Sequence, residues 1–168
     1  MSFKKTDISS LSFNPFNSIG KKWMLVTAGN SENFNTMTAS WGQMGVLWNK
    51  NVATCYIRPN RFTYQFIEND EYFSLSFLGE EYRKALQICG SKSGRDCDKI
   101  KEAGLTPVNI ENVMAFDEAD TIIICRKLYS QELSTDNFIK PENAGNFYEK
   151  DPVHIQYIAE IVAVYVKD

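Results

Sequence analysis

Alternating hydrophobic and polar positions recur along this chain and predict a protein built mainly from β-strands. Runs rich in β-branched and aromatic residues, with side chains that change face at each step, are typical of strands. We predict six strands, at Lys22–Ala28, Phe34–Trp41, Val52–Arg58, Tyr72–Phe77, Asp120–Ser134 and His154–Val166. Because strands and helices do not alternate regularly, antiparallel pairing is favoured over a doubly wound parallel sheet.

Helical patterns gather in the middle of the chain. Helices are predicted at Arg61–Asn69, Glu80–Cys89 and Asp96–Ala103. The last should begin with Asp96 as its N-cap and end at Gly104, since glycine readily adopts the left-handed helix terminus. Lys140–Asp151, which contains Pro141 and Gly145, is predicted to be a surface loop. We therefore expect one domain over residues 1–168, a mainly antiparallel β-barrel with a few peripheral helices.

Composition and charge narrow the class of partner. Hydrophobic residues make up 43% of the chain, enough for a substantial core, and 18 basic against 21 acidic residues leave a net charge of -3. That balance gives no broad attraction for nucleic acid or an anionic membrane. The N-terminus lacks the apolar segment of a secretory signal, and no run approaches the roughly 20 apolar residues that span a bilayer. We expect a soluble, cytoplasmic protein with a small-molecule ligand.

Cysteine and histidine are too sparse to predict a metal centre. Cys55, Cys89, Cys97 and Cys125 form no CxxC pair, and His154 is the single histidine. Cys89 and Cys97 are close enough to suggest redox chemistry, although buried or incidental thiols are commoner. His154 has a structural or surface interpretation and, as the alternative, a catalytic one as a proton donor. Without a GxSxG elbow or a recognisable nucleophile, a hydrolase triad is disfavoured.

The run NTMTASW, residues 35–41, carries the most informative polar pattern. Strand geometry places the hydroxyls of Thr36, Thr38 and Ser40 on one face. Met37, Ala39 and Trp41 then lie on the other face. The hydroxyl row has two interpretations, the wall of a polar ligand site or a solvent-facing ladder on an antiparallel sheet.

A second segment, residues 55–64, combines two arginines with a turn and the start of a helix. Arg58 and Arg61 flank Pro59 and Asn60. Guanidinium groups and free helix amides both favour a phosphate. Exposed arginines beside a turn are also commonly just solvated, so this pattern leaves both interpretations open.

A third segment, residues 89–99, is a compact loop with several hydrogen-bond donors between two predicted helices. Ser91, Lys92, Ser93 and Arg95 supply the donors. The loop has neither the GxxxxGK[ST] order of a Walker loop nor the GxGxxG of a dinucleotide fold. It is therefore either an anion-binding loop or an ordinary connection between helices.

Taken together, five segments resemble the flavin reductase-like, or flavoredoxin-type, family of FMN-binding split barrels. They are NTMTASWG at 35–42, YIRPNRFTY at 56–64, FSLSFL at 73–78, EEYRKAL at 80–86 and GSKSGRDCDK at 90–99. Their order and spacing match the family over about residues 23–129. The resemblance implies a mainly β, antiparallel, Greek-key-like split β-barrel that binds FMN non-covalently and works as a homodimer with flavin near the interface.

The resemblance also implies roles for individual residues. The flavin would be lined by Thr36, Met37, Thr38, Ala39, Ser40 and Trp41. The strand end at Tyr56, Ile57, Arg58 and Pro59 would lie along the isoalloxazine or ribityl chain, with Arg61 at the phosphate. The phosphate side would be closed by Ser91, Lys92, Ser93, Gly94, Arg95 and Lys99. Many relatives carry a glycine after the final-strand histidine, and the methyl of Ala159 here is expected to narrow the nicotinamide side of the pocket.

The leading functional hypothesis is an NAD(P)H-dependent flavin reductase, in which hydride passes from nicotinamide to FMN and electrons then pass to an acceptor. The cofactor supplies the reactivity, so no acid–base pair is required. One alternative is a non-enzymatic electron carrier or flavin-storage protein with the same bound FMN. Another is a sheet protein without flavin, in which the hydroxyl row is only surface.

Overall fold

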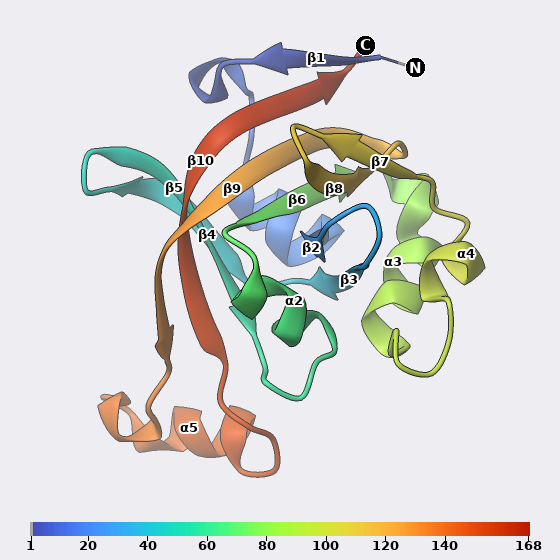
Figure 1. Ribbon diagram of the computed structural model, residues 1–168. Coiled ribbons are helices and arrows are strands. Elements are labelled where there is room, and N and C mark those ends of the chain that lie inside the picture. Colours follow the sequence, from blue (N-terminus) through green and yellow to red (C-terminus); the bar gives the residue numbers. More distant parts are fainter. Residues whose placement is uncertain (1) are drawn as a thin grey trace.

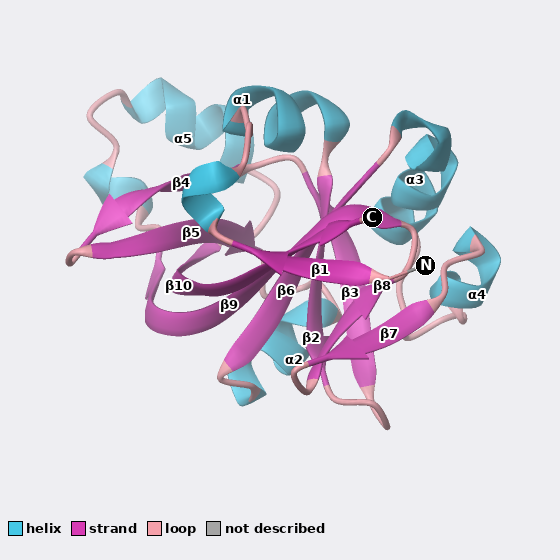
Figure 2. Ribbon diagram, turned by 90° about the horizontal axis from the view of Figure 1, so that it is seen from above, coloured by secondary structure: helices cyan, strands magenta, loops and turns pink. Residues whose placement is uncertain are grey.

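The structure, a computed structural model that describes residues 2–168, contains ten β-strands and five α-helices. The strands are β1 (Phe3–Thr6), β2 (Met24–Gly29), β3 (Phe34–Ala39), β4 (Gly42–Leu47), β5 (Lys50–Ile57), β6 (Tyr72–Leu78), β7 (Pro107–Ile110), β8 (Val113–Phe116), β9 (Ala119–Glu132) and β10 (Ile155–Lys167). The helices are α1 (Pro15–Asn17), α2 (Thr63–Asn69), α3 (Arg83–Ser91), α4 (Lys99–Ala103) and α5 (Pro141–Tyr148). A π-helical turn, Ser18–Lys22, follows α1 (Figure 2).

Eight strands form one antiparallel sheet in the order β3-β2-β6-β9-β10-β5-β4, with β1 paired to β10. The sheet curls around an apolar interior, but its edge strands β3 and β4 do not pair with each other. The barrel is therefore split between two strands that are consecutive in sequence. The hairpin β7–β8 forms a separate two-stranded sheet.

The long strands β9 and β10 hold the two halves of the sheet together (Figure 1). Strand β10 pairs with β9 over most of its length, with β5 through its first half and with β1 near its end. Register shifts at Ile158/Ala159 and Ile161/Ala163 mark irregularities in the β9–β10 ladder. Such bulges let a long strand bend around a barrel. The pairing of β1 with β10 brings the two chain ends together, as Figure 1 shows.

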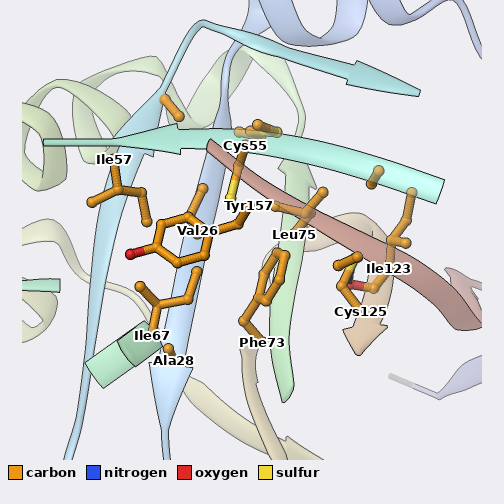
Figure 3. Close-up of a cluster of buried hydrophobic side chains, with 14 of the residues drawn as sticks. Val26, Ala28, Cys55, Ile57, Ile67, Phe73, Leu75, Ile123, Cys125 and Tyr157 are labelled. Atoms are coloured by element: carbon orange, nitrogen blue, oxygen red, sulfur yellow. Dashed lines mark hydrogen bonds between the residues drawn. The ribbon is translucent and has the colours of Figure 1, made fainter. Parts of the chain in front are cut away.

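The main core fills the inside of the curled sheet (Figure 3). Val26, Phe73, Ile123 and Tyr157 are fully buried there and come from four different strands. Tyr157 is anchored at its polar end, because its hydroxyl donates to Glu68 on α2 at 2.6 Å. A second apolar cluster lies between the sheet and α3. Because the two clusters lie on opposite faces of β2 and β6, these central strands are almost entirely buried.

All six predicted strands and the antiparallel arrangement are confirmed, with boundaries within a few residues. The sequence pattern did not predict β1, β4, β7 or β8. Strand β4 contains two glycines, Gly42 and Gly45, which weaken a strand pattern. It is fixed by a two-residue turn to β5, in which Trp48 and Asn49 have φ of 51° and 56°. Two successive residues of positive φ match the right-handed twist of a hairpin.

Two local predictions are wrong. Lys140–Asp151 is not a loop, because α5 occupies Pro141–Tyr148. Pro141 stands at the beginning of that helix, where its missing N–H is harmless. The N-cap before α4 is Asp98 rather than Asp96, and its carboxylate accepts a bond from the Lys101 amide at 3.1 Å. The predicted end at Gly104 is confirmed, with φ of 68°.

Candidate functional site

A cleft of about 250 Å³ lies beside the split of the barrel, where β3 and β5 both end. It is lined by Met37, Thr38, Ala39, Ser40, Trp41, Tyr56, Arg58, Arg61 and His154. All of these residues were predicted from the sequence as binding or catalytic candidates. The fold thus brings together the ends of two strands, the turn after β5 and the residue that precedes β10.

Strand β3 supplies one wall of the cleft, with α3 packed behind it. The Thr38 hydroxyl donates to the Leu86 carbonyl of α3 at 2.5 Å, so this threonine fixes the helix against the strand. Thr36 does not reach the cleft, because it is fully buried and its hydroxyl lies 2.8 Å from that of Thr27. The hydroxyl row is therefore neither a continuous ligand wall nor a solvent-facing ladder. Only Thr38 and Ser40 line the cleft.

A smaller cavity of about 90 Å³ adjoins the cleft and shares Met37 and Arg61 with it. Its polar lining comes from the start of α2 and from the loop after α3. The lining consists of Met37, Asn60, Arg61, Phe62, Thr63, Cys89, Ser91, Lys92, Ser93 and Lys99. Three cations and three hydroxyls meet here, and no carboxylate is among these lining residues. The cavity is electrostatically suited to a small anion.

Lys99 is the buried cation of this cavity, with only 4% of its surface exposed. Its ammonium group donates to the carbonyls of Cys89 and Lys92, both at 3.2 Å, at the end of α3. Burial lowers the pKa of Lys99, because desolvation disfavours its charged form. Lys92 instead forms an ion pair with Glu102. Among the described residues, 2–168, no carboxylate forms an ion pair with Arg61. Arg61 and Lys99 are therefore the cations best placed for a ligand.

Arg58 is held by the segment that contains α5. Its guanidinium lies 2.6 Å from the Asp151 carboxylate and donates to the Phe147 carbonyl at 3.2 Å. The Tyr148 ring lies 5.8 Å from the same guanidinium. Since Asp151 neutralises this cation, Arg58 is less suited to a phosphate than Arg61 is.

His154 lies between Trp41 and Tyr148 and is 9% exposed. Its Nδ1 is 2.9 Å from the Tyr148 hydroxyl, and its ring is 5.1 Å from that of Trp41. Burial lowers the pKa of His154 to about 4, and the charges of Arg58 and Arg61 add to this effect. The imidazole is consequently neutral near pH 7. It can accept or donate a hydrogen bond there, but it is not a charged acid.

Besides Thr36, four candidate residues lie outside the cleft and the small cavity. They are Ile57, Pro59, Gly94 and Arg95. Ile57 is fully buried in the core. Gly94 and Arg95 line a separate depression of about 510 Å³, where the Arg95 guanidinium lies 4.9 Å from the Phe62 ring. Gly94 and Arg95 therefore line a different hollow from the cleft.

The sequence pattern missed the residues that α5 and the segment directly after it contribute. Phe147 packs edge-on against Trp41 at 5.4 Å, while Tyr148 and Asp151 hold His154 and Arg58. The adjacent aromatic residues Phe147 and Tyr148 were a signal in the sequence. Because the segment was predicted to be a loop, no direction could be assigned to their side chains. The expectation for Ala159 is wrong, since its methyl is fully buried in the barrel core and cannot narrow the cleft.

The four cysteines are free thiols, and burial raises the pKa of Cys89 to about 11. A thiol with a raised pKa is a poor nucleophile, so the cavity beside Cys89 does not activate it. Over residues 2–168, no cluster of three or more His, Cys, Asp or Glu side chains is arranged to hold a metal ion. None of the helices in that range is long and apolar enough to cross a bilayer.

Comparison with known proteins gives a consistent picture. The family described as flavin reductase like domain matches residues 16–168. A comparison with curated proteins found no match. Among solved structures, flavoredoxin from Methanosarcina acetivorans aligns with a TM-score of 0.69 at 19% identity, covering 95% of this chain and 76% of that chain.

Two further solved structures are similar to this chain. An FMN-binding protein from Thermus thermophilus, with bound p-hydroxybenzaldehyde, has a TM-score of 0.70 at 18% identity over 98% of this chain and 82% of its own. An NADH:FAD oxidoreductase from Streptomyces globisporus, in complex with NAD and FAD fragments, has a TM-score of 0.64 at 16% identity over 87% and 74%. Together the matches confirm the mainly β split-barrel fold.

Proposed function

Because this chain belongs to the flavin reductase-like domain family, we propose that it binds FMN non-covalently in the cleft and the adjoining cavity. One observation carries the proposal. The cleft, which contains Trp41 and Tyr56, leads into a cavity with three cations, three hydroxyls and no carboxylate in its lining. FMN has the same two parts, a flat ring system and a phosphate monoester, so both its shape and its charge fit.

Arg61 and Lys99 are the proposed phosphate ligands, with Ser91 and Ser93 as hydroxyl donors. A guanidinium and a buried ammonium both form strong, charge-assisted bonds to a phosphate. Trp41 and Tyr56 supply aromatic surface for the ring, on which flat conjugated systems pack well. Five of the candidate residues line neither the cleft nor the small cavity, and we propose no direct flavin contact for Thr36, Ile57, Pro59, Gly94 and Arg95.

We further propose that the protein is an NAD(P)H-dependent flavin reductase. A bound flavin supplies the hydride chemistry. The chain's own residues would bind and orient the flavin and exclude water. His154 is neutral near pH 7, so we assign it no role as a charged proton donor. The similarity to an NADH:FAD oxidoreductase supports this proposal.

A homodimer is also part of the proposal. Val46 and Trp48 at the β4–β5 turn are exposed, and the Trp48 ring lies 6.2 Å from the exposed Tyr129. Contiguous exposed apolar side chains of this kind mark surfaces that a partner covers. Analytical ultracentrifugation should give a dimer for the wild type and a shift towards monomer for Trp48→Ser. A monomer in the wild type would refute this part.

The decisive experiment compares FMN with riboflavin, which lacks the phosphate. Titrations followed by flavin fluorescence should show that Arg61→Ala weakens FMN binding by about tenfold or more, as expected for a lost charge-assisted bond. Riboflavin binding should not change. Arg126→Ala removes a cation that is paired with Glu160, away from the cleft, and serves as the matched control.

Two outcomes would overturn the proposal. A folded wild-type protein that does not take up FMN would remove the flavin site. An equal loss of FMN and riboflavin affinity in Arg61→Ala would remove the phosphate assignment. Stopped-flow bleaching of bound FMN by NADH and NADPH then separates the reductase from the electron carrier. Slow bleaching by both nucleotides, with fast reduction by a redox protein, would favour the carrier.

A further inference from the structure

A second and larger groove, of about 710 Å³, adjoins the cleft and shares Ser40, Trp41 and Tyr56 with it. Its other wall comes from the N-terminal segment, where Phe16 and Ile19 lie in α1 and the π-helical turn. The family motifs at residues 35–42 and 56–64 supply part of the lining, but the sequence pattern gave no sign that the N-terminal segment would complete a groove there. Its volume falls within the range of about 300–1,000 Å³ that is usual for small-molecule sites.

The groove is apolar and carries no charge. None of its lining residues is acidic or basic, whereas the neighbouring cleft contains Arg58 and Arg61. Two of its aromatic side chains are open to solvent, Phe16 at 86% and Trp41 at 43% exposure. The polar side chains that reach it, apart from the Tyr56 hydroxyl, are Ser40 and Gln43. Both can donate a hydrogen bond to a neutral acceptor.

We propose that this groove binds an uncharged, planar aromatic ketone or quinone. Phe16, Trp41 and Tyr56 offer aromatic faces and edges to a flat ring, and Ser40 and Gln43 offer donors to its carbonyl oxygens. An anionic ligand is disfavoured, because the groove contains no cation to offset the cost of desolvating its charge. Placement of such a ligand beside a flavin rests on the proposed function, but binding in the groove does not.

The test uses a side chain that fills the groove. Gly20 lines it, and a Cβ at that position meets no atom within 4 Å, so Gly20→Leu adds bulk without a clash at the backbone. Gly145→Leu is the matched control, since a Cβ there also meets no atom within 4 Å and the residue does not line the groove. The probe is prodan, a neutral naphthalene ketone whose fluorescence shifts to the blue in apolar surroundings. The comparison ligand is the anion 2-naphthalenesulfonate.

The full-length wild type should bind prodan with a blue shift, and should bind 2-naphthalenesulfonate at least about tenfold more weakly. Gly20→Leu should weaken prodan binding by about tenfold, while Gly145→Leu should leave it unchanged. Equal prodan binding in Gly20→Leu and the wild type would overturn the inference, as would preference for the sulfonate. Prodan binding that appears only when the protein is diluted would assign the groove to a second copy of the chain and would also overturn it.

FMN titration of the same proteins separates this inference from the proposed function. Gly20→Leu should keep its FMN affinity, because Gly20 lines neither the cleft nor the small cavity. If the chain fails to bind FMN but prodan responds to Gly20→Leu, the proposed function falls and the groove assignment stands. If FMN binds but Gly20→Leu does not change the affinity for prodan, only the groove assignment is refuted.

Discussion

Acidification should destabilise this protein through its single histidine. His154 is buried between Trp41 and Tyr148, and the guanidinium groups of Arg58 and Arg61 oppose its protonation. Its pKa is about 4 in the folded protein, against 6.5 for the free side chain. The unfolded chain therefore takes up a proton below pH 6.5 that the folded chain refuses until about pH 4. This contribution to stability is complete above pH 6.5 and is lost as the pH falls to about 4.

The size of the effect follows from the difference between the two pKa values. A tenfold difference in proton affinity corresponds to about 1.4 kcal/mol, so the pKa values of 6.5 and about 4 set an upper limit of about 3–4 kcal/mol. His154 is buried but lines the cleft, and screening by the solvent in the cleft should reduce the effect to about 1–2 kcal/mol. A bound anion near Arg61 would offset part of the positive field. FMN should consequently raise the pKa of His154.

Urea unfolding of the wild type and His154→Gln at pH 7 and pH 4.5 measures this contribution to stability. Carboxylates titrate in both proteins, so the difference between their pH dependences isolates the histidine. The wild type should lose about 1–2 kcal/mol more of its free energy of unfolding than the variant does. Because the chain has one histidine, its NMR resonance gives the pKa directly. Identical pH dependence in the two proteins, or a measured pKa at or above 6.5, would refute the reasoning.

Other predictions follow from single contacts. Asp151→Asn weakens the ion pair with Arg58 and should speed chymotryptic cleavage after Phe147 and Tyr148; unchanged cleavage would show that the pair does not hold this segment. Thr38→Val removes the bond to the Leu86 carbonyl and should lower the free energy of unfolding by about 1 kcal/mol in urea, whereas an unaltered value would make that bond irrelevant to stability. Gly29→Ala places a Cβ 2.4 Å from a backbone oxygen at φ of 112° and should cost about 1–3 kcal/mol by thermal unfolding, a result that a wild-type melting temperature would contradict.

The site was predictable in part because its chemistry is local in sequence. Residues 37–41 and 56–61 each combine a strand end with polar or aromatic side chains, and these segments supply eight of the nine residues that line the cleft. Thr36 shows where the strand pattern stops being informative. Alternation gave its face correctly but could not show that Thr27 and α3 would cover that face.

The residues that the sequence missed lie at the end of long-range contacts. α5 lies in the segment that connects β9 to β10. It reaches the cleft because these strands pair along most of their length and β10 also pairs with β5, which places the connecting segment beside the end of β5. Phe16 reaches the same region through packing of the N-terminal segment, which no local pattern encodes.

The sequence by itself determined the strand pattern, the antiparallel class and the segments that carry donors and aromatics, because these depend on side-chain period and turn chemistry over a few residues. Only the tertiary structure decided which candidates share a cavity. Arg58 and Arg61 are three positions apart and chemically alike, yet Asp151 neutralises one and leaves the other available. Burial and charge pairing depend on neighbours that are distant in sequence, and folding alone brings those neighbours together.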